Sequence, residues 1–150
     1  MVNWGELPDA VLFACSLNSV RSPMAAAILN HLGGHNVHAS SAGARPGKID
    51  QFAVAVMDEI GIDISGHKPT AISDLEDASF DLIITLSPEA HHQALEFART
   101  NSTEVEYWPV QDPTAVSGSR ETILDAYRAC RDQLTSQIKQ RFGLGRAPHV

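Results

Sequence analysis

Short apolar runs alternate with helix-like segments along this chain, and this alternation restricts the fold more than any other feature of the sequence. Residues 10–15 (AVLFAC) and 80–86 (FDLIITL) have the composition of strands buried between other elements. Weaker strand-like runs cover residues 37–41 and 105–110. Strands that alternate with helices form a parallel sheet with helices on both faces. The sequence therefore predicts an α/β protein.

The segments between these runs carry signals for the starts of helices. Ser22-Pro23 and Ser87-Pro88 each place a serine, as the expected cap, before a proline in the first helical turn. Residues 51–60 have apolar positions at helical spacing and are followed by a glycine, which indicates a third helix.

A long amphipathic helix is predicted for residues 119–142. Its apolar side chains recur at steps of three and four, which gives the helix one buried stripe. The stripe consists of Ile123, Leu124, Tyr127, Cys130, Leu134 and Ile138. Cys130 is therefore expected to pack in the core. No repeat or linker is found, so we expect one domain over residues 1–150, with residues 1–9 and 143–150 as flexible ends.

Composition excludes several classes of protein. The chain of 150 residues is 43% apolar, which is enough for a real core. Its 11 basic and 18 acidic residues give a formal net charge of −7, which disfavours a broad nucleic-acid interface. No run approaches the ~18 consecutive apolar residues of a membrane span, and the first residues lack the pattern of a secretory signal. We expect a cytoplasmic protein that binds neither nucleic acid nor membranes.

The cysteines and histidines do not form a metal-binding pattern. Cys15 and Cys130 are far apart, and the chain has no Cys-x-x-Cys pair, so neither a disulfide framework nor structural zinc is indicated. His91 and His92 are adjacent, which is more typical of a solvated helix than of metal ligands. No metal or other cofactor is expected.

The segment after the first predicted strand has the composition of an anion-binding loop. Ligands of open parallel sheets bind beyond the carboxyl ends of the strands. Backbone N–H groups in a loop that leads into a helix can surround an oxyanion, and Arg21 could grip two of its oxygens. The positive field there would favour the thiolate form of Cys15, which could then attack the bound group. The loop residues are Ser16, Leu17, Asn18, Ser19, Val20, Arg21 and Ser22. Taken alone, Cys15 could instead be a small buried core residue.

Asp112 is the best candidate for a general acid. It follows the last predicted strand, so it reaches the same edge of the sheet as Cys15. Pro113 disfavours a helical conformation at Asp112 and so would project its carboxyl outward. From spacing alone, an ordinary Asp-Pro turn is the favoured interpretation.

Several blocks of the sequence carry a resemblance to a known family. They include VLFACSLNSVRSPMA, SSAG, GIDISGHKP, FDLIITLS and WPVQDP, in that order. With these blocks the chain resembles the low-molecular-weight protein tyrosine phosphatases, a family that also contains arsenate reductases of the thioredoxin-coupled type. The resemblance runs from Val11 to about Phe142. It implies a four-stranded parallel sheet flanked by helices, with the anion-binding loop after the first strand.

The resemblance also implies roles for individual residues. Cys15 matches the nucleophile, Arg21 the arginine that binds the transferred group, and Asp112 the general acid that later activates water. Asn18 matches the asparagine that supports the loop, and Ser22 the hydroxyl that hydrogen-bonds the thiolate. Ser41 and His67 match positions that hold this asparagine in place.

Three departures from the family pattern bear on function. Val20 stands where phosphatases of the family usually carry a second cysteine beside the arginine. Residues 44–50 contain no aromatic side chain to contact a phosphotyrosine ring, and Thr114-Ala115 replace the paired tyrosines of many members. These departures weaken the expectation of tyrosine specificity but leave the phosphate chemistry intact.

The sequence favours a phosphomonoesterase that acts through a cysteinyl-phosphate. One alternative is an arsenate reductase that uses an external thiol such as glutathione, because the segment TLSPEAHHQ, which includes Ser87, contains no cysteine for an internal relay and Cys130 is not placed to replace one. A second alternative is a non-catalytic binder of phosphoproteins or oxyanions. The expected partners are a phosphorylated protein, a small phosphate ester or arsenate, and the expected assembly is a monomer or weak dimer.

Overall fold

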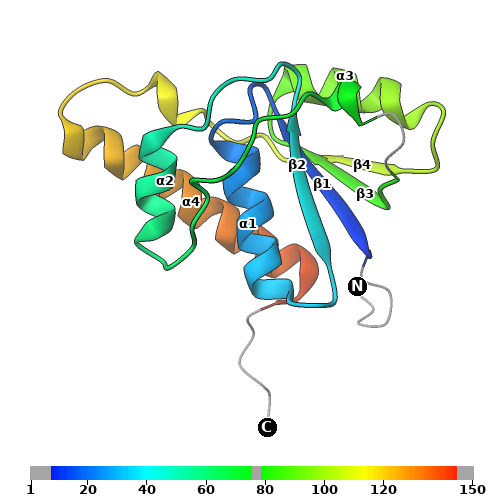
Figure 1. Ribbon diagram of the computed structural model, residues 1–150, viewed down its shortest axis with the longest axis horizontal. Coiled ribbons are helices and arrows are strands. Elements are labelled where there is room, and N and C mark those ends of the chain that lie inside the picture. Colours follow the sequence, from blue (N-terminus) through cyan, green and yellow to red (C-terminus); the bar gives the residue numbers. More distant parts are fainter. Residues whose placement is uncertain (1–7, 76–78, 145–150) are drawn as a thin grey trace, which may run out of the picture.

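The computed structural model describes residues 8–75 and 79–144 and contains one sheet of four parallel strands (Figure 1). The strands are β1 (Ala10–Cys15), β2 (His38–Gly43), β3 (Leu82–Thr85) and β4 (Glu104–Tyr107), in the order β2-β1-β3-β4. The predicted α/β fold with four parallel strands is therefore confirmed. The bounds of β2, β3 and β4 differ from the predicted ranges. A strand extends only as far as its backbone pairs with a neighbouring strand, and composition does not show where this pairing stops.

Helices cover both faces of this sheet (Figure 1). They are α1 (Arg21–Gly33), α2 (Gln51–Asp58), α3 (Pro88–Ala98) and α4 (Arg120–Phe142). Two short 3₁₀ turns, η2 (Ile72–Asp74) and η3 (Pro113–Ala115), complete the described elements. The helices α1 and α4 lie on one side of the sheet with α2 packed against α4, and α3 lies on the other side.

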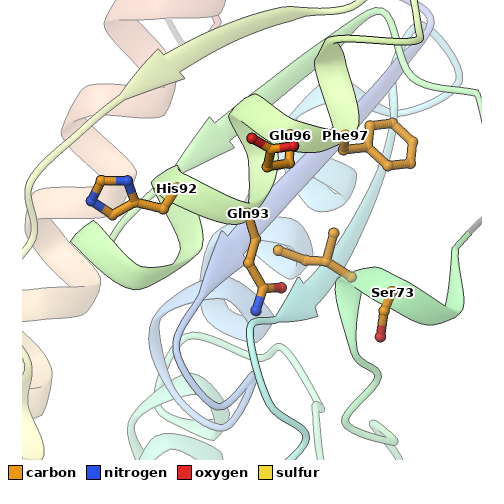
Figure 2. Close-up of a pocket in the computed structure, with 6 residues that line it drawn as sticks. Ser73, His92, Gln93, Glu96 and Phe97 are labelled. Atoms are coloured by element: carbon orange, nitrogen blue, oxygen red, sulfur yellow. The ribbon is translucent and has the colours of Figure 1, made fainter.

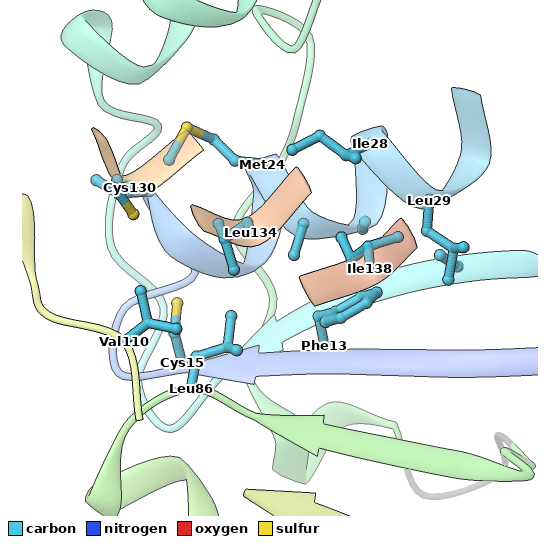
Figure 3. Packing of buried hydrophobic residues seen from close by; sticks show 14 of the residues in the cluster. Phe13, Cys15, Met24, Ile28, Leu29, Leu86, Val110, Cys130, Leu134 and Ile138 are labelled. Carbon is cyan, nitrogen blue, oxygen red and sulfur yellow. The ribbon is translucent and has the colours of Figure 1, made fainter. Parts of the chain in front are cut away.

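The alternation of side chains along β1 divides the core into two clusters. Val11, Phe13 and Cys15 point toward α1 and α4, where Figure 3 shows Phe13 and Cys15 beneath these two helices. Leu12 and Ala14 point to the opposite cluster, which includes residues of α3. Cys15 therefore presents its thiol on the side of the sheet from which α1 begins.

The strand order places the end of β1 at a topological switch point. From β1 the chain crosses through α1 to β2, whereas from β3 it crosses through α3, on the other face, to β4. The connections thus leave the neighbouring strands β1 and β3 in opposite directions. A crevice for ligands forms beyond the carboxyl ends of two such strands.

The helix starts agree with the sequence predictions at one serine and differ at another. The Ser87 hydroxyl accepts a hydrogen bond from the Ala90 amide and caps α3, as predicted. Ser22 does not cap α1, because that helix begins at Arg21 and Val20 occupies the cap position without a side-chain bond. The prediction for Ser22 was therefore wrong. Its hydroxyl lies inside the first turn, where it contacts Cys15.

Cys130 lies in the core, as its place on the apolar stripe of α4 predicted. It is 5% exposed and belongs to the same apolar cluster as Cys15 (Figure 3). Burial raises the pKa of the Cys130 thiol to about 12. This thiol is therefore protonated at neutral pH and packs as a small apolar side chain.

The described residues near both ends of the chain are bonded to the fold. The Asp9 carbonyl accepts a hydrogen bond from the His38 amide, and the Leu144 amide donates to the Lys139 carbonyl. The rest of the segments predicted as flexible ends, residues 1–7 and 145–150, lies outside the described residues. Within residues 8–75 and 79–144, no helix is long and apolar enough to cross a membrane.

Candidate active site

The predicted anion loop connects β1 to α1 and is built around Asn18. This residue has a φ of 55°, in the left-handed region, and its side chain is fully buried. Its Nδ2 donates to Ser22 Oγ at 2.8 Å, while its Oδ1 accepts from the Thr70 amide and from His67 Nε2, both at 2.9 Å. Three hydrogen bonds thus compensate for the strained backbone and hold the turn of the loop in place.

Only one of the two residues predicted to hold Asn18 does so. His67 makes the expected contact, but none of the hydrogen bonds to the Asn18 side chain in the described structure comes from Ser41. The Thr70 amide supplies the remaining contact, so the prediction for Ser41 was wrong on this point. Thr70 is brought there because its carbonyl accepts from the Gly43 amide at the end of β2. A backbone amide has no side-chain signature, so no residue pattern could have indicated this contact.

His67 is neutral in this environment. Burial lowers the pKa of its imidazole below the ordinary 6.5. Because Asn18 Oδ1 is an acceptor, the neutral ring must carry its proton on Nε2 and donate it there. The histidine therefore supports the loop without adding a positive charge behind it.

The Ser22 hydroxyl contacts the thiol of Cys15. Ser22 Oγ lies 2.9 Å from Cys15 Sγ, and both groups are buried. Because Ser22 Oγ already accepts from Asn18 Nδ2, its own proton is available to the sulfur or to the Ala42 carbonyl at 3.3 Å. A hydroxyl in this place can stabilise a thiolate by donating a hydrogen bond to it.

The Arg21 guanidinium is fixed to the ends of two strands. Its Nη1 donates to the Leu86 carbonyl at 3.2 Å and to the Val110 carbonyl at 3.0 Å, beyond β3 and β4. Arg21 is only 8% exposed, so few of its rotamers remain accessible. Both bonds use the same nitrogen, and Nη2 faces Asp112, with 3.6 Å between Nη2 and Asp112 Oδ2.

Asp112 is both a turn residue and a group at the mouth of the site. Its Oδ1 accepts from the Thr114 amide at 2.9 Å and from the Thr114 hydroxyl at 2.7 Å, which starts the 3₁₀ turn η3. Its Oδ2 lies toward Arg21, and the side chain is 44% exposed. The sequence offered a turn residue and a general acid as alternatives for Asp112. The two roles are compatible, because Oδ1 forms the turn and Oδ2 remains free of it.

A glycine allows the anion loop to lie against the end of β2. A Cβ added at Gly43 would come within 2.7 Å of the Asn18 amide nitrogen and within 2.9 Å of the Arg45 carbonyl oxygen. Both contacts are with backbone, so neither could move aside cheaply. Any larger residue at this position would displace the loop.

A hollow of about 510 Å³ lies apart from the anion loop (Figure 2). It is formed by residues of η2 and α3, on the face of the sheet opposite to Cys15. Its lining is Ile72, Ser73, His92, Gln93, Glu96 and Phe97. None of the predicted site residues is among these, so the hollow is separate from the candidate active site. No group of three or more potential metal ligands was found in residues 8–75 and 79–144.

A four-stranded parallel sheet with a Cys-x₅-Arg loop after its first strand and an aspartate at the mouth defines a class of α/β enzymes that act on oxyanions. The chain belongs to the low molecular weight phosphotyrosine protein phosphatase family, whose sequence model matches residues 10–144. The resemblance proposed from the sequence is thereby confirmed.

Individual relatives are named for two activities. The chain is 29% identical over 129 residues to the glutaredoxin arsenate reductase of Synechocystis sp., covering 86% of this chain and 92% of the relative. It is 32% identical over 132 residues to an arsenate reductase of Bacillus licheniformis, covering 87% and 92%. A solved arsenate reductase in its phosphate-binding state superposes with a TM-score of 0.72 at 27% identity, covering 90% and 97%. The low molecular weight protein tyrosine phosphatase from T. tengcongensis superposes with a TM-score of 0.73 at 25% identity, covering 90% and 98%.

Proposed function

We propose that this enzyme hydrolyses phosphate monoesters through a cysteinyl-phosphate intermediate. The observation that carries the proposal is the position of Asp112 Oδ2, 3.6 Å from Arg21 Nη2 at the mouth of the loop that begins with Cys15. An arginine at this point can bind the oxygens of a phosphoryl group. A carboxyl group beside it can donate a proton to the oxygen of the leaving group.

In the first step, the Cys15 thiolate attacks phosphorus in line with the leaving group. The P–S bond forms as the P–O ester bond breaks, and Asp112, in its acid form, donates a proton to the departing oxygen. The loop amides and the Arg21 guanidinium stabilise the equatorial oxygens during transfer.

In the second step, the Asp112 carboxylate accepts a proton from water, and that water attacks phosphorus. The P–S bond breaks, and Cys15 leaves as a thiolate. The Ser22 hydroxyl, 2.9 Å from the sulfur, stabilises this leaving group by donating a hydrogen bond. Inorganic phosphate then leaves the loop, and both groups are in their starting states.

A second candidate function is arsenate reduction with an external thiol, and the names of the relatives favour it. Arsenate has the shape and charge of phosphate and would occupy the same loop. The Cys15 thiolate would attack arsenic and expel water. Glutathione would then attack Cys15 Sγ, releasing arsenite and leaving a Cys15–glutathione disulfide for a second thiol to reduce. Ser87 occupies the place of an internal relay cysteine, and the high pKa of Cys130 makes it unsuited to that role.

The proposed substrates are phosphorylated proteins or small phosphate esters, with arsenate as the alternative. A nucleophilic cysteine functions only when it is reduced, and the chain uses its two cysteines as free thiols. We therefore propose a cytoplasmic location. As the assembly we propose a monomer or weak dimer.

Two assays on the same preparation separate the candidates. Hydrolysis of p-nitrophenyl phosphate, with Cys15→Ser as the control, supports the phosphatase. Arsenite production from arsenate with glutathione and glutaredoxin, but not without them, supports the reductase. Phosphate binding without either turnover would contradict both activities and favour the non-catalytic oxyanion binder.

A further inference from the structure

A neighbouring segment is bonded along the outside of the anion loop. We call residues 44–50 the strap. Four backbone amides of the strap donate to four carbonyls of the loop segment. The bonds run from Ala44 to Cys15 (2.9 Å), from Arg45 to Ser16 (2.9 Å), from Gly47 to Leu17 (2.9 Å) and from Asp50 to Ser19 (3.2 Å). The strap therefore draws the carbonyl groups of the loop outward.

The direction of these carbonyls determines the direction of the loop amides. In a trans peptide unit, the C=O of one residue and the N–H of the next point in opposite directions. The described residues contain no cis peptide bond. When the strap holds the carbonyls of residues 15, 16, 17 and 19 on the outside, the N–H groups of residues 16, 17, 18 and 20 face inward. These inward amides are the donors that an oxyanion requires.

Asp50 anchors the end of the strap. Its Oδ1 accepts from the Phe52 and Ala53 amides at 2.8 and 3.3 Å, which caps α2. Its Oδ2 accepts from the Tyr127 hydroxyl at 2.8 Å. Its own amide is the strap donor to the Ser19 carbonyl. One residue therefore joins the anion loop, the start of α2 and the side of α4.

Tyr127 is held rigidly for this contact. Its side chain is 2% exposed, and its ring packs against Phe52 with 5.4 Å between centroids. Burial and the bond to Asp50 raise the pKa of its phenol, so the hydroxyl stays protonated and acts as the donor. It partners the Asp50 oxygen that the helix cap does not use, so the carboxylate is bonded through both of its oxygens.

We propose that Asp50 and Tyr127 form a positioning pair that sets the oxyanion affinity of the anion loop by fixing the strap. Neither residue contacts the bound group. They act through the peptide unit between Ser19 and Val20, whose amide they aim at the anion. The inference rests on the oxyanion-binding role of the loop in the proposed function, and it applies to phosphate and arsenate alike.

The strap also contains a glycine, Gly47, at which a substitution can separate the strap from the anion loop. A Cβ at Gly47 would lie 2.7 Å from Ser19 Oγ and 3.1 Å from Leu17 Cβ. The Ser19 hydroxyl can rotate away from such a Cβ, but Leu17 Cβ and the Leu17 carbonyl oxygen at 3.3 Å are fixed to the loop backbone. Gly47→Ala is therefore expected to push the strap away from Leu17. This change leaves the Asp50–Tyr127 bond untouched, so it tests the strap independently of the pair.

The experiment compares Tyr127→Phe with Glu59→Gln. Tyr127→Phe keeps the ring and removes one hydroxyl. Glu59→Gln weakens a different polar contact between the end of α2 and α4, because Glu59 bonds Arg128 and Arg131 far from the loop. The measurements are the dissociation constant of inorganic phosphate by calorimetry, KM and kcat for p-nitrophenyl phosphate, and Tm.

Tyr127→Phe is expected to weaken phosphate binding and raise KM by about threefold to tenfold, the effect of one hydrogen bond. Gly47→Ala should also weaken phosphate binding and raise KM. Asp50→Asn keeps an acceptor for the helix cap, so it should lose less phosphate affinity than Asp50→Ala. Glu59→Gln should lower Tm without changing the phosphate dissociation constant or KM. Unchanged phosphate affinity in Tyr127→Phe and Gly47→Ala would overturn the inference, as would an equal loss in Glu59→Gln. Failure of the wild-type enzyme to bind phosphate would overturn the proposed function as well, which distinguishes the two failures.

Discussion

Ser22 Oγ lies 2.9 Å from Cys15 Sγ, although seven positions separate the two residues in the chain. The contact exists because α1 starts at Arg21, which turns the Ser22 side chain back toward the end of β1. The same hydroxyl accepts from Asn18 Nδ2, so the nucleophile is connected through Ser22 and Asn18 to His67.

Cys15→Ser is expected to abolish hydrolysis of p-nitrophenyl phosphate while the protein still folds and binds phosphate. A serine hydroxyl is a poor nucleophile without an adjacent base, and the loop amides and Arg21 remain in place. Steady-state kinetics, calorimetry with phosphate and circular dichroism check these points. Substantial turnover by the folded variant would exclude Cys15 as the nucleophile.

Arg21→Lys is expected to lower kcat/KM by about 10²–10³, the usual effect of removing one donor to a developing charge. Lysine keeps the positive charge but cannot bond the Leu86 and Val110 carbonyls and still present a planar pair of donors to the phosphoryl oxygens. The kinetics should be measured beside Arg99→Lys, a change at an exposed arginine that bonds Glu96 within the same segment. A near-normal rate for Arg21→Lys would show that another group binds the anion.

Asp112→Asn is expected to slow hydrolysis of phenyl phosphate far more than that of p-nitrophenyl phosphate. General acid catalysis contributes about 10²–10⁴, and an activated leaving group needs little of it. The asparagine can still accept the bonds from Thr114, so the turn should persist. Equal rate losses for both esters would make Asp112 a structural residue only.

His67→Gln is expected to change how stability depends on pH. The folded pKa of His67 is lowered, so the unfolded chain binds a proton first as pH falls below the ordinary value of 6.5. The wild-type free energy of unfolding should therefore drop relative to the variant as pH falls from about 7 toward the lowered folded pKa. Glutamine can still donate to Asn18 Oδ1. Urea unfolding at several pH values tests this, and parallel curves for the two proteins would contradict it.

Glu59→Gln is expected to destabilise the protein at neutral pH but not near pH 2. Hydrogen bonds from Arg128 and Arg131 lower the pKa of the Glu59 carboxyl to about 2 from 4.5. A lowered carboxyl pKa contributes stability that is complete above 4.5 and is lost as pH falls through the folded value. The difference in Tm between wild type and variant should shrink over that interval. A difference that stays constant with pH would assign the effect to packing.

The sequence alone was sufficient for the architecture and for the residues whose side chains carry a pattern. The composition of residues 10–15 and 80–86 predicted buried parallel strands, because only strands covered on both faces are so apolar. Cys15 and Arg21 were predicted because their spacing spans one loop between a strand and a helix. Spacing alone supported Asp112 less strongly, because an Asp-Pro pair is common in turns. Its place after the last strand and the family resemblance of the WPVQDP block favoured it as the acid.

The tertiary structure decided what the backbone does around these residues. The Thr70 amide, rather than Ser41, completes the support of Asn18. Residues 44–50 hold the loop carbonyls outward, and Asp50 is bonded by Tyr127 from a helix 77 positions further along the chain. Every residue except proline has an amide and a carbonyl, so the sequence does not reveal which of them will meet. That choice depends on how the strands and helices pack, because packing alone sets which distant backbone segments come within hydrogen-bond distance.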